Sequence, residues 1–150
     1  MTFGNIYNIR TIKGGVYMSN MNLLLPYRKK GTTVYYLVKR EFIAGWDQHP
    51  DLCGITVAVP DDQLDKELEN KMKTEMHITF EHNDLIHLGV CAIKRSSDHI
   101  CYLYALDLSK RTEVPDKDLG DYLWVTDDTI MESIDPQLLS CYAKLRYLVF

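Results

Sequence analysis

Residues 56–78 read TVAVPDDQLDKELENKMKTEMHI, and this stretch restricts the fold more than any other part of the chain. It opens with β-branched residues and reaches Pro60, which predicts a short strand that ends at the proline. Asp61 and Asp62 then favour a helix start, because carboxylates are stabilised at the positive end of a helix dipole. Apolar residues at steps of four predict an amphipathic helix after them. These residues are Leu64, Leu68, Met72 and Met76.

The chain on either side of this stretch predicts two β-hairpins. Before it, residues 22–29 and 33–40 are rich in β-branched and aromatic side chains and flank turn residues that end at Gly31. After it, residues 84–93 and 99–108 form a second apolar pair around a polar turn. The nearly continuous apolarity of the last run predicts a strand that is covered on both faces.

The rest of the chain predicts a loop, a short strand and a final helix. Residues 109–121 are charged and contain proline and glycine, which is typical of a surface loop, and residues 122–125 (YLWV) indicate a strand. Asp135 and Pro136 predict a helix cap and the first helical residue. The expected apolar stripe of this helix is Leu138, Tyr142, Leu145 and Val149. Strands and helices in this order predict an α/β or α+β protein with helices packed on a mixed sheet.

Length and composition exclude several classes of protein. The chain has 150 residues, 46% of them hydrophobic and 25% charged, so we expect one globular domain over residues 1–150. Residues 1–20 show no sustained period and are expected to form an N-terminal strand pair or arm, and residues 47–50 are loop-like. The formal net charge of −4 argues against a nucleic-acid partner. No apolar run approaches the roughly 20 residues that a membrane-spanning helix needs, so we expect no membrane partner. The four cysteines form no CxxC pair, which favours reduced thiols in a cytoplasmic protein.

The order of the elements resembles the Nudix fold, in which a helix that carries catalytic carboxylates lies between sheet segments. The family motif is Gly, five residues, Glu, seven residues, then Arg-Glu-apolar-x-Glu-Glu-x-Gly-apolar, and residues 56–78 align with it without a gap. The anchor is residues 74–78 (TEMHI), which stand where the family has Glu-Glu-x-Gly-apolar. The resemblance covers residues 22–145. It implies a Nudix-like α/β/α sandwich, with a mixed sheet, a motif helix and a C-terminal helix.

The chain departs from this motif at most of its polar positions. The substituted residues are Thr56, Asp62, Asn70, Lys71, Thr74 and His77. Lys71 and Thr74 replace two of the three glutamates that bind metal in the family, and Glu75 keeps the third. Magnesium prefers several oxygen ligands, and a lysine repels it, so the resemblance leaves Glu75 as the candidate metal ligand of a weakened site. Glu75 and Asp62, a shorter carboxylate in place of the first glutamate, are the candidate catalytic residues.

Helical spacing suggests what Lys71 does. It precedes Glu75 by one helical turn, so the two side chains can form an ion pair. Glu75 projects within the arc of the apolar stripe, beside Leu68 and Met72, where a charge is costly unless it is paired. We therefore hypothesise that the Lys71 ammonium occupies the position of a family metal. The alternative is that this helix face is an ordinary solvated surface.

Aromatic residues are the candidates for substrate binding. Trp46 and Trp124 fall where many family members carry tryptophan. Tyr36 is the candidate among five tyrosines on predicted strands, of which one or two could stack on a purine base: Tyr35, Tyr36, Tyr102, Tyr104 and Tyr122. Packing in the core is the alternative role for these tyrosines.

Three functions follow from these residues. The first is a Nudix-like domain that binds a nucleotide or nucleoside-diphosphate derivative with little or no hydrolysis. The second is an active magnesium-dependent nucleoside-diphosphate hydrolase with a rebuilt metal site. The third is a protein-interaction or dimerisation scaffold, since the N-terminal arm and the last tyrosine and leucine pairs are compatible with a symmetric homodimer.

Overall fold

Two long β-hairpins provide most of the sheet, as the sequence predicts. The computed structural model describes residues 20–43, 49–59 and 66–150. The predicted N-terminal arm lies, except for its last residue, outside this described part. The first hairpin pairs β1 (Asn20–Lys30) with β2 (Thr33–Phe42), and the second pairs β5 (Leu85–Ala92) with β6 (Ile100–Asp107).

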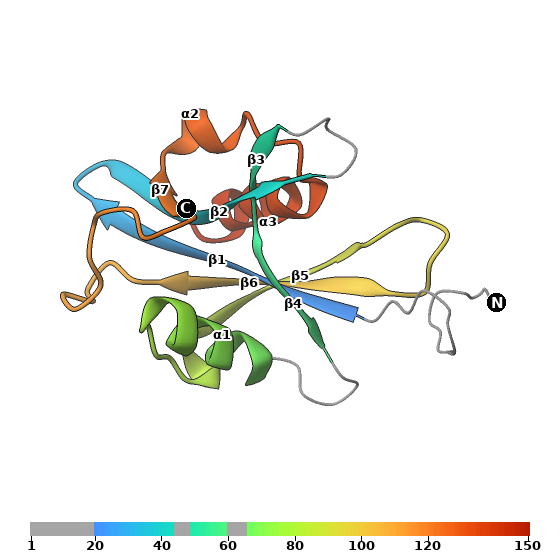
Figure 1. Cartoon of the computed structure of the whole chain (residues 1–150), viewed down its shortest axis with the longest axis horizontal. Coiled ribbons are helices and arrows are strands. Elements are labelled where there is room, and N and C mark those ends of the chain that lie inside the picture. Colours follow the sequence, from blue (N-terminus) through green and yellow to red (C-terminus); the bar gives the residue numbers. More distant parts are fainter. Residues whose placement is uncertain (1–19, 44–48, 60–65) are drawn as a thin grey trace.

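Within the described residues, β1 is the central strand of a seven-stranded sheet whose main order is β3-β2-β1-β6-β5 (Figure 1). It runs parallel to β6 and antiparallel to β2 and to β4 (Ile55–Val59). β2 also pairs with β3 (Pro50–Cys53) and with β7 (Tyr122–Val125). The parallel pairing of β1 with β6 joins the two hairpins into one mixed sheet.

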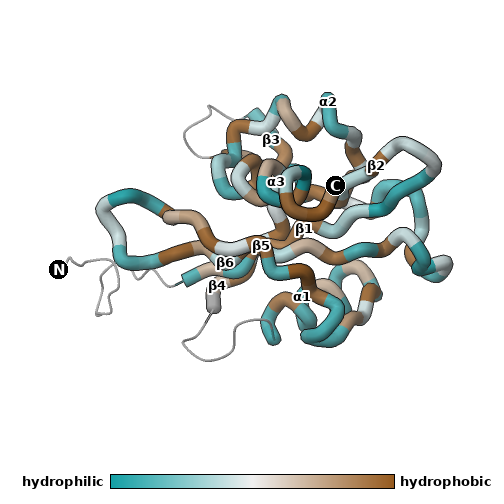
Figure 2. Tube along the Cα trace, turned by 180° about the vertical axis from the view of Figure 1, so that it is seen from behind, coloured by the Kyte–Doolittle hydropathy of each residue, from teal (hydrophilic) through white to brown (hydrophobic). Residues whose placement is uncertain are grey.

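The sheet separates two helical layers, because neighbouring residues of a strand point to opposite faces. Leu23 and Leu25 belong to the core on the side of α3 (Pro136–Leu148), whereas Leu24 belongs to the core on the side of α1 (Lys66–Met76). All three leucines are fully buried. Figure 2 shows the hydrophobic chain at the centre of the sheet and the hydrophilic chain at the hairpin tips. The architecture is the predicted α/β/α sandwich with a mixed sheet.

The helix predicted within residues 56–78 is α1. Its buried residues are Leu68, Met72 and Met76, so the predicted apolar stripe is confirmed for the described residues. Leu64 and the predicted helix start at Asp61 and Asp62 lie outside them.

α3 begins where the sequence predicts. Asp135 caps the helix by accepting a hydrogen bond from the backbone N–H of Gln137 at 3.1 Å, and Pro136 follows in the first turn. The second Asp135 oxygen accepts the N–H of Gly54 at 3.0 Å, which ties the helix start to the β3–β4 corner. A Cβ at Gly54 would lie 2.4 Å from a methyl carbon of Leu23, so this corner requires glycine.

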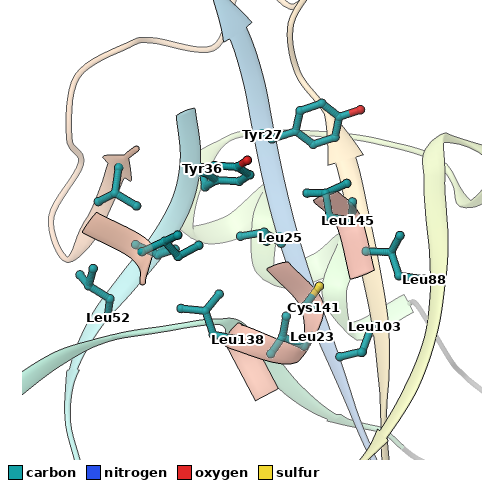
Figure 3. Close-up of a cluster of buried hydrophobic side chains, with 14 of the residues drawn as sticks. Leu23, Leu25, Tyr27, Tyr36, Leu52, Leu88, Leu103, Leu138, Cys141 and Leu145 are labelled. Carbon is teal, nitrogen blue, oxygen red and sulfur yellow. The ribbon is translucent and has the colours of Figure 1, made fainter. Parts of the chain in front are cut away.

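The buried face of α3 differs in part from the predicted stripe. Leu138 and Leu145 are buried as predicted, and Cys141 joins them against the sheet (Figure 3). Tyr142 is half-buried, and Val149 lies beyond the last helical residue, so the prediction of Val149 as a stripe position is wrong.

Three short elements are absent from the sequence prediction. They are β3, the helix α2 (Asp127–Ile130) and a 3-10 turn at His82–Asp84. Each is only three to four residues long, which is too short for a hydrophobic period to mark it. Pro50, predicted as part of a loop, is the first residue of β3. Among the described residues, none of the helices combines the length and the apolarity required to traverse a bilayer.

Replacing a β1 core leucine tests this division of the core. We expect Leu24→Ala to lower the free energy of unfolding by about 2–5 kcal/mol, because it leaves a cavity under α1. Urea unfolding measures the loss. The matched control is Leu148→Ala on α3, where the side chain is exposed and the change should stay within about 0.5 kcal/mol. Equal losses of unfolding free energy in Leu24→Ala and Leu148→Ala would contradict the burial of Leu24 under α1.

Candidate functional site

Glu75, on the last turn of α1, is the centre of a polar cluster. Its Oε1 accepts a hydrogen bond from the hydroxyl of Tyr122 on β7, and its Oε2 lies 3.6 Å from the ammonium of Lys71. The predicted Lys71–Glu75 pair is therefore confirmed. The carboxylate lies at the edge of the apolar stripe rather than within it, since the Glu75 side chain is 41% exposed.

Lys39, on β2, completes this group, which we call the Glu75 cluster: Lys39, Lys71, Glu75 and Tyr122. The register of the sheet places Lys39 opposite Tyr122, and its ammonium lies 5.6 Å from the centre of the tyrosine ring. Lys39 also forms an ion pair with Glu41 at 3.4 Å. Three elements of the fold thus bring four polar side chains to one side of the sheet, beside α1.

The Glu75 cluster shifts the acidity of its members. The hydrogen bond from Tyr122 holds the pKa of Glu75 below its usual range, and the charges of Lys71 and Lys39 act in the same direction against partial burial. Burial and the Glu75 carboxylate raise the pKa of Tyr122. At neutral pH the carboxyl group of Glu75 is therefore ionised and the phenol of Tyr122 is neutral.

The backbone conformation of His77 supports the alignment of residues 56–78 with the family motif. This residue stands where the family motif has its closing glycine, and it has a φ of 57°, a left-handed conformation that favours glycine. The backbone N–H of Ile78 closes the helix end by donating to the carbonyl of Met72 at 3.2 Å. This left-handed backbone is compatible with the glycine that the resemblance places at position 77, and in that alignment residues 71, 74 and 75 fall at the metal-binding positions of the family motif.

The residues at these positions do not fit magnesium. They provide one carboxylate, Glu75, whose two oxygens already have partners in Tyr122 and Lys71, together with an exposed Thr74. Within the described residues, no three His, Cys, Asp or Glu side chains are grouped so that they could hold a metal ion. Magnesium needs several hard oxygen ligands, which this arrangement lacks.

A cavity of about 500 Å³ lies beside β7, between the tip of the β1–β2 hairpin and the loop that follows β6. Figure 1 shows these segments at the same end of the sheet. The cavity has aromatic, cationic and acidic walls. Its lining residues are Arg28, Lys30, Tyr35, Asp116, Lys117, Asp118 and Trp124. We call it the β7 pocket.

Buried Arg28 holds one wall of the β7 pocket in place. Its Nε donates to the carbonyl of Leu108 at 3.3 Å, and its Nη2 donates to the carbonyls of Arg111 at 3.0 Å and Val114 at 2.8 Å. Nη1 pairs with Asp116. Because these bonds occupy the guanidinium, Arg28 positions the loop instead of offering its charge to a ligand.

Trp124 links the β7 pocket to the Glu75 cluster. Its indole N–H donates to the carbonyl of Pro115 at 3.2 Å, and the Arg28 guanidinium lies 5.2 Å from the ring centre. Tyr122 precedes Trp124 by two residues on β7, so both side chains lie on the same face of the strand, roughly 6.6 Å apart along it. The β7 pocket and the Glu75 cluster are therefore adjacent.

The structure places the predicted site residues in different surroundings. Trp124 lines the β7 pocket, and Glu75 lies next to it. Tyr36 is instead fully buried on the α3 side, where its hydroxyl donates to Asp127 at 2.9 Å and its ring contacts Tyr142 edge-on. This corrects the prediction for Tyr36: its alternative role in the core is the one observed. Its neighbour Tyr35 lines the pocket, since adjacent strand residues face opposite ways. Trp46 and Asp62 lie outside the described residues.

The sequence assigns no site role to Arg28, Lys30, Lys39 or Lys117, and Tyr122 is only one of the strand tyrosines expected to stack on a base. The sequence does contain one indication of this site: Tyr122 and Trp124 have the two-residue spacing that puts both side chains on one face of a strand. The lysines and the arginine come from strands and a loop that only the folded chain brings together.

Removing the Tyr122 hydroxyl tests the Glu75 cluster. We expect Tyr122→Phe to raise the pKa of Glu75, since it deletes the largest influence that lowers it. Carboxyl NMR titration of Glu75 measures the change. Because the folded-state pKa is lowered, the hydrogen bond stabilises the fold above the usual pKa of glutamate and loses this effect as the pH falls. If the titration midpoint of Glu75 is the same in Tyr122→Phe and in the wild type, the hydrogen bond between Tyr122 and Glu75 is contradicted.

A charge reversal tests the position of Lys71. Lys71→Glu places a second carboxylate one turn before Glu75, at a metal-binding position of the family motif, and should create a measurable affinity for Mg²⁺ in calorimetry. Lys73→Glu makes the same charge change on an exposed position of α1 and serves as the control. Equal Mg²⁺ affinities for Lys71→Glu and Lys73→Glu would refute the alignment of Lys71 with a metal-binding position of the motif.

Comparison with known proteins identifies the fold. No family model and no curated protein sequence matches this chain. Among solved structures, the NUDIX domain of Shewanella oneidensis NrtR, complexed with ADP ribose, superposes with a TM-score of 0.64 at 9% identity over 94% of each chain. The C-terminal domain of mouse MUTYH, from a complex with human PCNA, has a TM-score of 0.64 at 12% identity, covering 85% of this chain and 87% of that chain. C. elegans Ap4A hydrolase has a TM-score of 0.58 at 15% identity, covering 89% and 99%. At these identities the likeness establishes the fold alone. The chain has a Nudix-like fold.

Proposed function

We propose that this Nudix-like domain binds a nucleotide or nucleoside-diphosphate derivative with little or no hydrolysis. The observation that carries the proposal is the β7 pocket, which combines aromatic and cationic side chains and adjoins the Glu75 cluster. Its volume of about 500 Å³ is in the range of small-molecule sites.

The chemistry of the pocket suits both parts of a nucleotide. The rings of Tyr35 and Trp124 offer surfaces on which a base can stack. Lys117 gives the pocket wall positive charge that attracts an anionic ligand, whereas the Lys30 ammonium is paired with Asp116. The NrtR domain, which has the same fold, was solved with ADP ribose, and this supports ADP ribose as the first ligand to test.

Hydrolysis is expected to be weak because the chemistry needs divalent ions. These ions neutralise the diphosphate and activate the attacking water. The positions that would hold them carry Lys71 and Thr74 beside an already paired Glu75. Each 1.36 kcal/mol added to the barrier slows the reaction about tenfold, so losing a metal-bound hydroxide lowers the rate by orders of magnitude.

A protein-interaction scaffold is the second candidate function. Tyr147 and Leu148, near the end of α3, are 86% and 58% exposed, and tyrosine is enriched at protein interfaces. A homodimer through this end of the chain is one form that the scaffold would take.

Calorimetry with ADP ribose tests the first proposal. We expect binding to the wild type, and a loss of roughly 5- to 150-fold in affinity for Tyr35→Leu and Trp124→Leu, the range that base stacking on one ring supports. Tyr35→Leu leaves the contact between Arg28 and Trp124 in place, and Tyr147→Leu on the exposed end of α3 is the control. Thermal unfolding verifies that each variant is folded.

A product assay separates binding from catalysis. Turnover of ADP ribose that requires Mg²⁺ and disappears in Glu75→Gln would contradict the proposal and indicate a rebuilt metal site. If the folded wild type neither binds nor hydrolyses ADP ribose or a panel of nucleotides, the nucleotide proposal fails and the scaffold function takes its place.

A further inference from the structure

The Glu75 cluster offers hydrogen-bond donors where the family motif offers acceptors. Both oxygens of Glu75 have partners, one in the Tyr122 hydroxyl and the other in the Lys71 ammonium. An ammonium group carries three N–H donors, and the described contacts of Lys71 engage it in one ion pair of 3.6 Å, longer than a hydrogen bond. A cation approaching this cluster would find occupied acceptors, whereas an anion would find available donors.

The charges of Lys39 and Lys71 are only partly screened by solvent. The side chains of Lys39 and Lys71 are only 22% and 20% exposed, so solvent screens their charges less than at an open surface. They come from β2 and α1, and both charges act on Glu75. Glu41, the acidic neighbour of Lys39, has a side chain that is 46% exposed and can turn to solvent when an anion binds.

The position of this cluster matches the phosphate end of a bound nucleotide. Tyr122 lies one same-face step along β7 from Trp124, which lines the β7 pocket. A base that stacks on Trp124 or Tyr35 would direct its phosphates along β7 toward Lys39 and Lys71.

We infer that the ammonium groups of Lys39 and Lys71 bind the diphosphate of the ligand directly, so that binding requires no divalent cation. The inference rests on the proposed function for the nucleotide part of the ligand. It assigns to the Glu75 cluster a diphosphate-binding role in place of metal binding. Glu75 and Tyr122 then act as positioning residues, because they hold the Lys71 side chain over β7.

Calorimetry with two probes, ADP ribose and inorganic pyrophosphate, tests this inference in EDTA and in MgCl₂. We expect the affinity of the wild type for ADP ribose in EDTA to lie within about twofold of its value with Mg²⁺. Lys71→Met and Lys39→Met should each weaken both probes at least about tenfold, as expected for the loss of a charge-assisted hydrogen bond. Lys73→Met, at an exposed position of α1, should change neither affinity.

Pyrophosphate distinguishes failure of this inference from failure of the proposed function. It has no base, so it should bind the wild type and Trp124→Leu equally well. Pyrophosphate binding that depends on Lys39 and Lys71 without binding of ADP ribose would support the diphosphate site and contradict the nucleotide pocket. ADP ribose binding that EDTA abolishes, or that Lys71→Met and Lys39→Met leave unchanged, would overturn the inference and leave the nucleotide pocket intact.

Discussion

The structure depends on the burial of β1 between two helical layers. Leu23 and Leu25 pack toward α3 and Leu24 packs toward α1, and all three side chains are fully buried. Their alternation fixes the register of β1, since a shift by one residue would exchange the two cores. β2, β4 and β6 all pair with this strand, so its register determines where the remaining strands and the helices lie.

The same strand positions the candidate site. β1 continues from its leucines to Arg28, whose guanidinium holds the carbonyls of the loop after β6 and contacts the Trp124 ring. A buried cation that satisfies three carbonyls and one carboxylate stabilises a loop that has little secondary structure of its own. One wall of the β7 pocket is therefore an extension of the core.

The Glu75 cluster lies on the last turns of α1, just before the left-handed backbone of His77. Lys71 and Glu75 are neighbours there because residues four apart lie on the same face of a helix. The Lys71 ammonium lies 3.6 Å from the Glu75 carboxylate and offsets its charge. The chemistry of such a site depends on its side chains, which is why fold similarity alone does not establish an activity.

The sequence by itself determined the two hairpins, α1, α3 and the Nudix-like order of elements, because periodic burial and the Asp135–Pro136 helix start leave strong local signals. It also determined the Lys71–Glu75 pair, which depends on helical spacing alone. Only the tertiary structure decided which tyrosine of the pair at 35 and 36 faces the β7 pocket, because strand alternation defines two faces without saying which one is covered by α3. The contact of Tyr122 with Glu75, the loop that Arg28 holds and the approach of Lys39 join residues far apart in the chain, and no local pattern records such contacts.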